Sequence, residues 1–523
     1  MRWRPAPFSL CLLAACSTSA SPSAPHADAG HATTDSGHAV DAHTHAPDAR
    51  TPDATGPATD ATDASDASDA SDAAPPFDAF TFDAGDQDLV LAPWNTQAAI
   101  FVDGFAAASL DQIDCRTQIC QHNEDTDMIA WNGAIFMVHR TARAQILGPN
   151  SALLVYRSMD GGASFQPVAR IDAPMTPIDA NDSATAGRDI RDPAFFIVKD
   201  ASGTESLHLK AITRLPTNIA LVQTRDTGVD SISVGMSSAD GTTWSPLARL
   251  APDTWSFWRV KEVGGVFYSA AYHDGDSSVS LFSSPDGVTW TQGAQVFGIT
   301  SDTPLETELV PMPNGTMLAL VRTDGSNADL PGNDGNQRTQ VCWAKPPYAS
   351  WSCPETILGE RFDGPVAFFW QGRLFVIARR HVDTNGVRNR KRTSLFELAP
   401  APTVVWDGGA DAGLNGDGAY LVPIDAGVDG SSAASGDWTA RVTDGGAEAG
   451  AFDDEPTLAV KWWGDLPSAG DTAYAGVAFS DATHVRVVWY AGDTAADVDW
   501  YTSMIGPTNI WLGTLDLTKV HGP

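Results

Sequence analysis

Short apolar runs alternate with turn residues from about residue 86 onward, and this pattern predicts strands joined by reverse turns. The clearest example begins at Glu306, where a mixed run leads to a turn at Asn314-Gly315. A second apolar run follows the turn and ends at Arg322, 16 residues after Glu306. If both arms are strands, Glu306 and Arg322 return to the same end of one hairpin.

The same arrangement recurs in other hairpins, always at a spacing of 16 residues between the two polar positions. Three hairpins pair an acid with an arginine, and a fourth carries two tyrosines. The pairs are Glu124 with Arg140, Glu306 with Arg322, Asp363 with Arg379, and Tyr474 with Tyr490. We interpret the repetition as a four-stranded unit that presents polar residues at one end.

Six such units are expected, so the fold class we predict is all-β, a six-bladed β-propeller. The units span residues 121–171, 189–250, 253–299, 303–358, 362–407 and 471–517. We expect residues 88–105 to supply a strand that closes the ring beside the last unit, because an open sheet edge would remain unpaired. The Gly-, Ala- and Asp-rich segment at about 408–454 is interpreted as an insertion in the propeller domain, 86–523.

The chain before the propeller has the composition of an export signal and a tether. Residues 1–16 combine arginines, an apolar run and the sequence Leu-Ala-Ala-Cys, which resembles a bacterial lipobox. That resemblance implies lipidation of Cys16 and a place in the bacterial envelope, at the outer membrane and facing the periplasm or the surface. An ordinary signal peptide is the alternative. Residues 17–85 hold almost no large apolar residue, so we expect a disordered linker whose histidines are solvated spacer.

The charge of the chain limits its partners. A formal net charge of −33 argues against nucleic acid or an anionic membrane surface as a ligand. Membrane contact is expected only through the lipid anchor, since no later run is long and apolar enough to span a bilayer. We expect a monomer without a cofactor or a catalytic metal, and leave a structural Ca²⁺ open.

Four of the six cysteines fall as local pairs after the signal. Cys115 is followed by Cys120, and Cys342 by Cys353. In an oxidising compartment we expect each pair to form a disulfide. No histidine keeps a ligand spacing with these cysteines, so a metal site is the weaker interpretation.

Three turns share a motif that resembles the Asp-box of sialidase-type propellers. The motifs begin at Ser158, Ser238 and Ser284, and each continues with an Asp two residues later, a Gly and an aromatic residue. The Asp accepts backbone N–H groups across the turn, and the Gly supplies a positive φ. We expect these structural turns to lie away from the functional site.

The resemblance to sialidases extends to the hairpins. The segment from Glu306 to Arg322 looks like the one that carries the catalytic glutamate and the second arginine of that family, and Arg379 falls where the third arginine is expected. Tyr474 stands where the family places its nucleophile. The resemblance implies an exo-glycoside hydrolase on extracellular glycans, with arginines that grip a substrate carboxylate. A neutral tyrosine activated by Glu306 suits an anionic substrate, which would repel a carboxylate nucleophile.

Two departures leave part of this site open. Glu124 stands where the first sialidase arginine is expected, so Arg191 of the neighbouring unit becomes the candidate for that role. The acid that protonates the leaving oxygen is sought among Asp125, Asp127 and Asp226.

The Arg-Asp-Pro segment at 191–193 also resembles other propeller glycosidases, which use carboxylates throughout. A variant interpretation therefore assigns Asp125, Asp192 and Glu306 as the catalytic set on a neutral sugar. The remaining substrate-binding candidates are Asp363 and Trp258. Trp258 is either a platform for a sugar ring or a core residue.

Two further classes compete with the enzyme. A non-catalytic propeller that binds glycan or protein predicts a pocket whose arginines are paired internally by carboxylates. Arg140, Arg322 and Arg379 would then only hold the blade ends together. A ligand-free scaffold predicts a filled or apolar central channel. Guanidinium groups of Arg322 and Arg379 more than about 10 Å apart would exclude the sialidase interpretation, because one carboxylate could not bridge them.

Overall fold

The structure, a computed structural model, describes residues 98–107, 114–145, 150–182, 188–214, 231–273, 278–298, 303–323, 338–358, 361–383, 390–400, 438–440 and 458–520. They belong to one compact unit, Pro75–Pro523. The signal, the lipidation of Cys16, the linker and the candidate acid Asp226 all lie outside the described residues. Among the residues described, no helix is both long and apolar enough to cross a membrane.

The first three blades are antiparallel sheets whose strands follow in chain order from the inside outward. Blade 1 contains β2 (His122–Trp131), β3 (Ala134–Ala142), β4 (Ala152–Ser158) and β5 (Gln166–Asp172). Blade 2 contains β6 (Asp189–Lys199), β7 (Glu205–Arg214), β8 (Ser231–Ser238) and β9 (Ala248–Arg249). Blade 3 contains β10 (Trp255–Val263), β11 (Val266–His273), β12 (Ser278–Ser284) and β13 (Thr291–Gly298).

The other three blades keep this plan with two variations. Blade 4 contains β14 (Pro304–Pro311), β15 (Met317–Thr323), β16 (Arg338–Ala344) and β17 (Ser352–Leu358). Blade 5 contains β18 (Asp363–Trp370), β19 (Arg373–Asp383), β20 (Arg390–Pro400), β22 (Leu458–Asp465) and β21 (Trp438–Ala440). Blade 6 contains β23 (Thr472–Phe479), β24 (His484–Ala491), β25 (Asn509–Asp516) and β1 (Ala99–Val102), with α1 (Trp500–Ile505) before β25 and the 3-10 turn η1 (Leu517–Lys519) after it.

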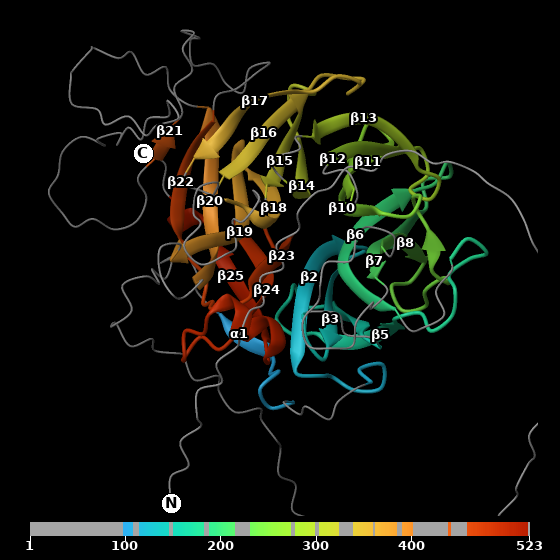
Figure 1. The fold of residues 1–523 in the computed structure, drawn as a ribbon, viewed down its shortest axis with the longest axis vertical. Helices are drawn as coiled ribbons and strands as arrows, with labels where there is room; N and C mark the ends of the chain where they lie inside the picture. Colours follow the sequence, from blue (N-terminus) through green and yellow to red (C-terminus); the bar gives the residue numbers. More distant parts are fainter. Residues whose placement is uncertain are drawn as a thin grey trace, which may run out of the picture. The chain divides into compact units, whose positions relative to one another are not determined.

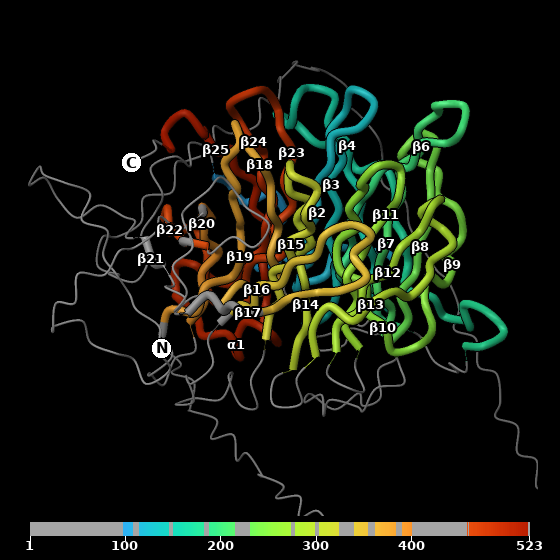
Figure 2. The backbone as a smooth tube through the Cα atoms, turned by 90° about the horizontal axis from the view of Figure 1, so that it is seen from above, coloured from blue at the N-terminus to red at the C-terminus, as the bar shows by residue number. Residues whose placement is uncertain are grey.

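The innermost strands contact one another in a closed circle, which makes the six sheets a propeller (Figure 1). The circle runs β2, β6, β10, β14, β18, β23 and back to β2. In the perpendicular view the C-terminal blade, in red, lies beside the first blade, in cyan and teal (Figure 2). The predicted six-bladed propeller is confirmed.

Ring closure joins the two ends of the described chain. Strand β1 pairs with β25 in blade 6, with Ala99 opposite Leu512. The expectation that residues 88–105 supply the closing strand is therefore confirmed. One unit boundary was wrong, because blade 5 does not end at residue 407. Its fourth strand is β22, which pairs with β20 from beyond the insertion.

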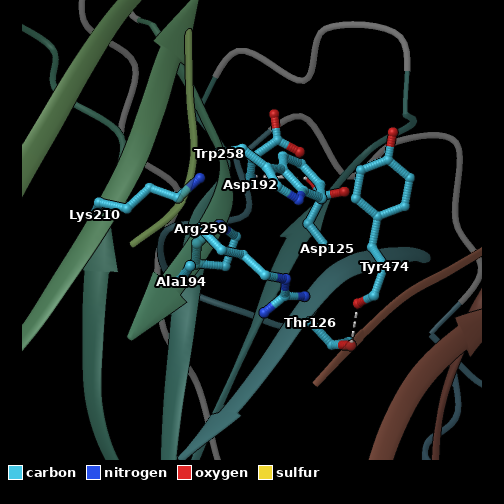
Figure 3. Close-up of a pocket in the computed structure, with 9 residues that line it drawn as sticks. Asp125, Thr126, Asp192, Ala194, Lys210, Trp258, Arg259 and Tyr474 are labelled. Atoms are coloured by element: carbon cyan, nitrogen blue, oxygen red, sulfur yellow. Dashed lines mark hydrogen bonds between the residues drawn. The ribbon is translucent and has the colours of Figure 1, made fainter. Parts of the chain in front are cut away.

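Every innermost strand has a β-bulge near its start. Two residues of the inner strand oppose one residue of the second strand, and the register shifts at the same place in all six blades. The bulges lie between Glu124 and Asp127, Arg191 and Ala194, Phe257 and Val260, Pro304 and Thr307, Asp363 and Val366, and Ala473 and Gly476. Bulge residues from four blades line one pocket (Figure 3).

Three of these bulges hold a residue with a side chain in the left-handed region. Asp125, Asp192 and Tyr474 have φ values of 52°, 51° and 45°. Such conformations cost free energy for residues that carry a Cβ, and they persist where the surrounding structure enforces them. The bulges thus hold these three side chains in place at the pocket.

The Asp-box turns lie at the opposite edge of the blades from the bulges. They follow β4, β8 and β12, the third strand of each blade, whereas the bulges begin the first strand. Because successive strands are antiparallel, the start of the first strand and the end of the third lie at opposite edges. The expectation that these turns lie away from the pocket is confirmed.

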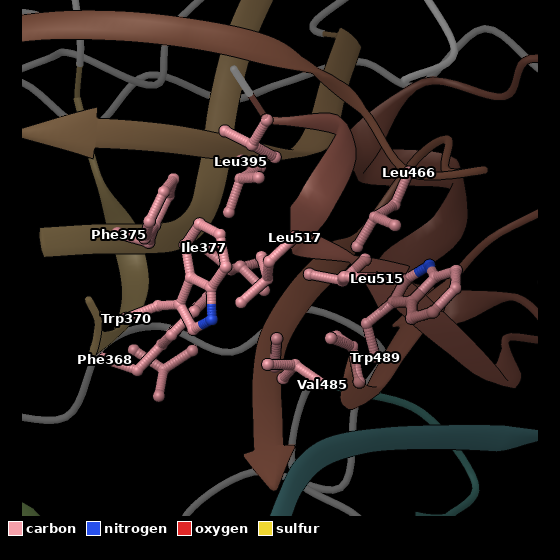
Figure 4. Close-up of a cluster of buried hydrophobic side chains, with 14 of the residues drawn as sticks. Phe368, Trp370, Phe375, Ile377, Leu395, Leu466, Val485, Trp489, Leu515 and Leu517 are labelled. Carbon is pink, nitrogen blue, oxygen red and sulfur yellow. The ribbon is translucent and has the colours of Figure 1, made fainter. Parts of the chain in front are cut away.

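Apolar side chains fill the space between neighbouring sheets. Between blades 5 and 6 a buried cluster includes Phe375 and Ile377 from β19 and Trp489 from β24 (Figure 4). Alternate residues of each strand face this layer, as the period of two in a strand requires. Two disulfides, Cys115–Cys120 and Cys342–Cys353, join residues close in sequence.

Candidate active site

The pocket lies at the bulged edge of the ring. Its lining comes from blades 1, 2, 3 and 6 and comprises Asp125, Thr126, Asp192, Pro193, Ala194, Lys210, Trp258, Arg259 and Tyr474 (Figure 3). The sequence analysis named four of these residues as site candidates: Asp125, Asp192, Trp258 and Tyr474. Two carboxyl groups, two cations and two aromatic rings therefore face one small space.

Tyr474, at the wall of the pocket, forms a short hydrogen bond with Glu306. The Tyr474 hydroxyl donates to Glu306 Oε1 over 2.6 Å, although the residues belong to blades 6 and 4. Arg322 Nη1 contacts both oxygens of Glu306 at 2.7 and 2.9 Å and lies 3.4 Å from the tyrosine hydroxyl. All three side chains are buried. The structure thus brings together Tyr474 and Glu306, which the sequence analysis paired as candidate nucleophile and base.

The ring of Tyr474 is fixed from several sides. Trp258 meets it edge-on with centroids 5.6 Å apart, and the guanidinium carbon of Arg379 lies 5.5 Å from the ring centroid. A Cβ added to Gly364 would come within 2.8 Å of Tyr474 Cδ2, so only a glycine fits beneath the ring. Burial, and then the Glu306 carboxylate, raise the pKa of Tyr474 well above its ordinary value, so the hydroxyl holds its proton.

Asp125 and Asp192 stand side by side at the pocket. The Asp192 backbone N–H donates to Asp125 Oδ2 over 3.3 Å. Burial, and then the nearby charges of Glu124 and Asp192, raise the pKa of Asp125 well above its ordinary value. A carboxyl group held in its protonated form can donate a proton near neutral pH. Asp125 is therefore the acid candidate that the pocket contains.

Asp363 lies behind Tyr474 and is held by three arginines. Arg322 Nε lies 3.1 Å from Oδ1, Arg379 Nε lies 3.1 Å from Oδ2, and Arg361 Nε lies 2.5 Å from Oδ1. Burial alone would raise the pKa of Asp363, but Arg322 and then Arg361 bring it well below its ordinary value. Arg322 and Arg379 bind the same carboxylate, so their guanidinium groups lie close enough together to pass the distance limit set in the sequence analysis. That carboxylate, however, belongs to the protein.

Arg191 and Arg140 form a second ion-pair group in blades 1 and 2. Arg191 lies 2.8 Å from Asp189 and 3.6 Å from Glu124. Arg140 contacts the same two carboxylates. Arg191, the candidate first arginine, is absent from the pocket lining, and internal carboxylates hold it. The acid-to-arginine pairs expected for a non-catalytic propeller are thus all present.

Trp258 and Arg259 fill the axis of the ring below the pocket. Both lie in the blade 3 bulge, and Trp258 Nε1 donates across the axis to the Pro365 carbonyl of blade 5 over 3.3 Å. Arg259 pairs with Asp127 of blade 1 and donates to the Ala475 carbonyl of blade 6. Trp258 is only 3% exposed, so it forms the floor of the pocket.

Asp127 is a bridge between blades and does not line the pocket. Its Oδ2 accepts the Phe195 N–H of blade 2 at 2.6 Å. Glu308 does the same between blades 4 and 5, since Oε1 accepts the Ala367 N–H and binds Lys261 Nζ. Both carboxylates serve assembly of the ring.

The sequence analysis missed Lys210 and Arg259. Each stands between apolar residues of its strand, Lys210 between Leu209 and Ala211 and Arg259 between Trp258 and Val260, and a cation with two apolar neighbours was the available signal. Lys210 Nζ donates to the Phe257 carbonyl at 2.7 Å, and burial lowers its pKa to about 8.

Three buried residues, His122, Glu124 and Asp471, bring ligand-type atoms within 4.8 Å of one another. Arg140 pairs with Glu124, and Arg379 pairs with Asp471. Their carboxylates already have cationic partners, so we treat the cluster as part of the ion-pair network.

Comparison with known proteins bears on the fold. No family model matches the sequence, and no curated protein matches it. Among solved structures, a protein of unknown function from Dyadobacter fermentans is 15% identical over 81% of this chain and 98% of its own, with a TM-score of 0.49. The NanB sialidase from Streptococcus pneumoniae is 12% identical over 76% of this chain and 69% of its own, with a TM-score of 0.47.

A third solved structure, the intramolecular trans-sialidase from Ruminococcus gnavus, is 11% identical over 83% of this chain and 100% of its own, with a TM-score of 0.48. At these identities the similarity concerns the architecture alone and does not bear on activity. The chain is a six-bladed β-propeller, as the closed circle of its inner strands shows.

Proposed function

We propose that the protein is a glycoside hydrolase in which Tyr474 is the nucleophile. The observation that carries the proposal is the 2.6 Å hydrogen bond from the Tyr474 hydroxyl to Glu306, at the wall of a pocket that also holds Asp125. A tyrosine beside a carboxylate base, at a pocket that also holds a carboxyl group with a raised pKa, can perform glycosidic cleavage with retention.

In the first step the Tyr474 oxygen attacks the anomeric carbon and its proton passes to Glu306. The bond from the anomeric carbon to the leaving oxygen breaks, and that oxygen takes the Asp125 proton. In the second step the Asp125 carboxylate removes a proton from water, which attacks the anomeric carbon. The tyrosine oxygen then leaves and recovers its proton from Glu306, so the enzyme returns to its starting state.

Arg322 supports this chemistry by position. Its Nη1 contacts the Glu306 carboxylate and approaches the Tyr474 oxygen. It therefore lies next to the negative charge whether the shared proton is on the tyrosine or on the glutamate. A buried, preorganised cation next to developing charge stabilises the transition state more than the ground state. Arg379 acts on the ring of Tyr474 from the other side.

A panel of fluorogenic glycosides tests the proposal with a matched pair of variants. Tyr474→Phe should lower kcat by about 10³-fold or more, because it removes the attacking atom. Tyr490→Phe should leave kcat unchanged, since the Tyr490 hydroxyl is buried and has no partner in the part of the chain described. Turnover by Tyr474→Phe equal to wild type, or no turnover of any glycoside by wild type, would refute the proposal.

A glycan-binding propeller without activity is the second candidate. The observation in its favour is that Glu306, Asp363 and Glu124 already pair the arginines of the pocket region. This candidate predicts that glycan binding, measured by calorimetry, is the same for wild type and Tyr474→Phe while neither protein releases product. Hydrolysis by wild type would exclude it.

A further inference from the structure

Asp363 occupies the place between two arginines that an anionic substrate group would need. Its two oxygens contact Arg322 and Arg379 at 3.1 Å each, and Arg361 at 2.5 Å. His381 Nε2 lies 2.8 Å from Oδ2. The Asp363 side chain is fully buried, so it is a permanent partner of these arginines.

The surrounding network holds as many carboxylates as guanidinium groups. Arg140 and Arg191 bind Glu124 and Asp189. Arg322, Arg361 and Arg379 bind Glu306, Asp363 and Asp471. In the part of the chain described, each of these five guanidinium groups therefore has a carboxylate partner within the protein, and buried Lys391 adds a further cation 3.1 Å from His381. A ligand carboxylate that entered the network would have to share guanidinium groups that already bind protein carboxylates, so the loss of its hydration would be poorly compensated.

The pocket itself does not supply a positive surplus. Asp125 and Asp192 face it, and Lys210 and Arg259 are its cations. Arg259 pairs with Asp127, and burial lowers the pKa of Lys210 to about 8. The acidic pair therefore stands beside cations that are already engaged with protein groups.

We infer that the substrate is a neutral sugar, and that Asp363 is the specificity determinant that excludes a carboxylate at the anomeric carbon. The inference rests on the proposed function. It assigns the site to glycosides of neutral aldoses. A phenol nucleophile is compatible with a neutral sugar, because Asp125 and Asp192 already place two carboxyl groups at the pocket and a third would raise their mutual repulsion.

The wild-type protein gives the first test, with 4-methylumbelliferyl glycosides of neutral aldoses, of glucuronic acid and of N-acetylneuraminic acid. The best neutral glycoside should exceed both anionic ones in kcat/KM by about 100-fold or more, which corresponds to about 2.7 kcal/mol. A preference for an anionic glycoside would overturn the inference and leave the hydrolase proposal standing. Turnover of none of them would refute the hydrolase, and the inference with it.

A variant pair gives the second test. Asp363→Asn removes the negative charge but keeps the shape, so it should narrow the preference for neutral over anionic glycosides by about tenfold or more. Asp465→Asn is the control, because Asp465 is an equally buried carboxylate of blade 5 that binds Arg380 and Ser394, whereas Asp363 binds Arg322 and Arg379. An unchanged preference in folded Asp363→Asn would overturn its assigned role. If that variant does not fold, the wild-type comparison decides.

Discussion

The two edges of the propeller are built from contacts of different range. In the Asp-box at Ser158, Asp160 accepts the Ser158 hydroxyl at 2.7 Å and the Ser164 N–H at 2.9 Å, all within one turn. At the pocket edge, the Tyr474 hydroxyl reaches Glu306, 168 residues away in sequence. A turn of the first kind forms within its own segment, whereas the pocket forms only when the blades have assembled.

Asp286 at the Asp-box edge and Asp125 at the pocket edge differ in the direction of their pKa shifts. At the Asp-box edge, the Thr289 N–H is the main cause that lowers the pKa of Asp286 to about 2. At the pocket edge, burial raises the pKa of Asp125. The same residue type is therefore a fixed anion in a local turn and a protonated acid in the assembled site. Substitutions should affect local stability at one edge, and activity or the stability of the whole ring at the other.

The largest effect is expected at the axis. Arg259→Met leaves Asp127 buried without its cation, so the free energy of unfolding should fall by about 3–5 kcal/mol in urea titrations. The double variant Asp127→Asn/Arg259→Met should recover part of that loss. Equal losses in the single and double variants would mean that the ion pair does not hold the ring.

If Asp125 is the catalytic acid, the effect of replacing it on kcat should depend on the leaving group of the substrate. Asp125→Asn should lower kcat on the order of 10²-fold for alkyl glycosides, and far less for dinitrophenyl glycosides, whose oxygen leaves without a proton. Wild-type kcat should fall as pH rises through the Asp125 pKa, because only the protonated form donates. The same loss for both kinds of leaving group would assign the acid elsewhere.

Asp125 should also make stability depend on pH. Its pKa is raised in the folded protein, so the folded state binds the proton more tightly than the unfolded chain. The stabilisation is present below the ordinary pKa of an aspartate and is lost as pH rises through the raised value. Asp125→Asn should therefore flatten the decline in the free energy of unfolding across that window. An unchanged slope in the variant would contradict the assignment.

A smaller effect is expected beneath the ring of Tyr474. Gly364 has a positive φ of 55°. In Gly364→Ala the added Cβ would lie 2.8 Å from Tyr474 Cδ2, so the tyrosine ring would have to shift. A displaced nucleophile should lower kcat by about 10-fold to 100-fold. Gly372→Ala, in the turn of the same hairpin, has a φ of 80° but no atom within 4 Å of the added Cβ, and should leave kcat unchanged. An equal loss of kcat in the two variants would show that backbone strain, and not the contact with Tyr474, causes the loss.

The smallest effect belongs to the Asp-box edge. Asp286→Ala removes the acceptor for the Val288 and Thr289 N–H groups at an exposed turn. The free energy of unfolding should fall by about 1 kcal/mol or less, because water replaces the lost partner. Hydrolysis should be unchanged. A marked loss of kcat would mean that the two edges are coupled.

The sequence predicted those features that arise from local patterns. The spacing of 16 residues identified the hairpins, and through them Glu306, Arg322 and Tyr474, which the structure brings together. Disulfides between Cys115 and Cys120 and between Cys342 and Cys353 followed from proximity in sequence.

Features that depend on pairing between distant segments were missed. Asp127 is one of the three candidate acids of the sequence analysis, but its Oδ2 accepts the Phe195 N–H of blade 2 and it does not line the pocket. The role of Asp363 as internal partner of Arg322 depends on contact between blades 4 and 5. Strand β22 could not be joined to blade 5 because the insertion separates it from β20.

The pairing of β1 with β25 has a consequence for folding. These strands stand about 410 residues apart in the chain, so β1 is synthesised long before β25 and cannot pair until β25 has formed. Until then blade 6 has an exposed edge that can accept a foreign strand. The ring therefore closes only after β25 has been synthesised, and the seam between β1 and β25 is the part of the ring that stays open to wrong pairing until then.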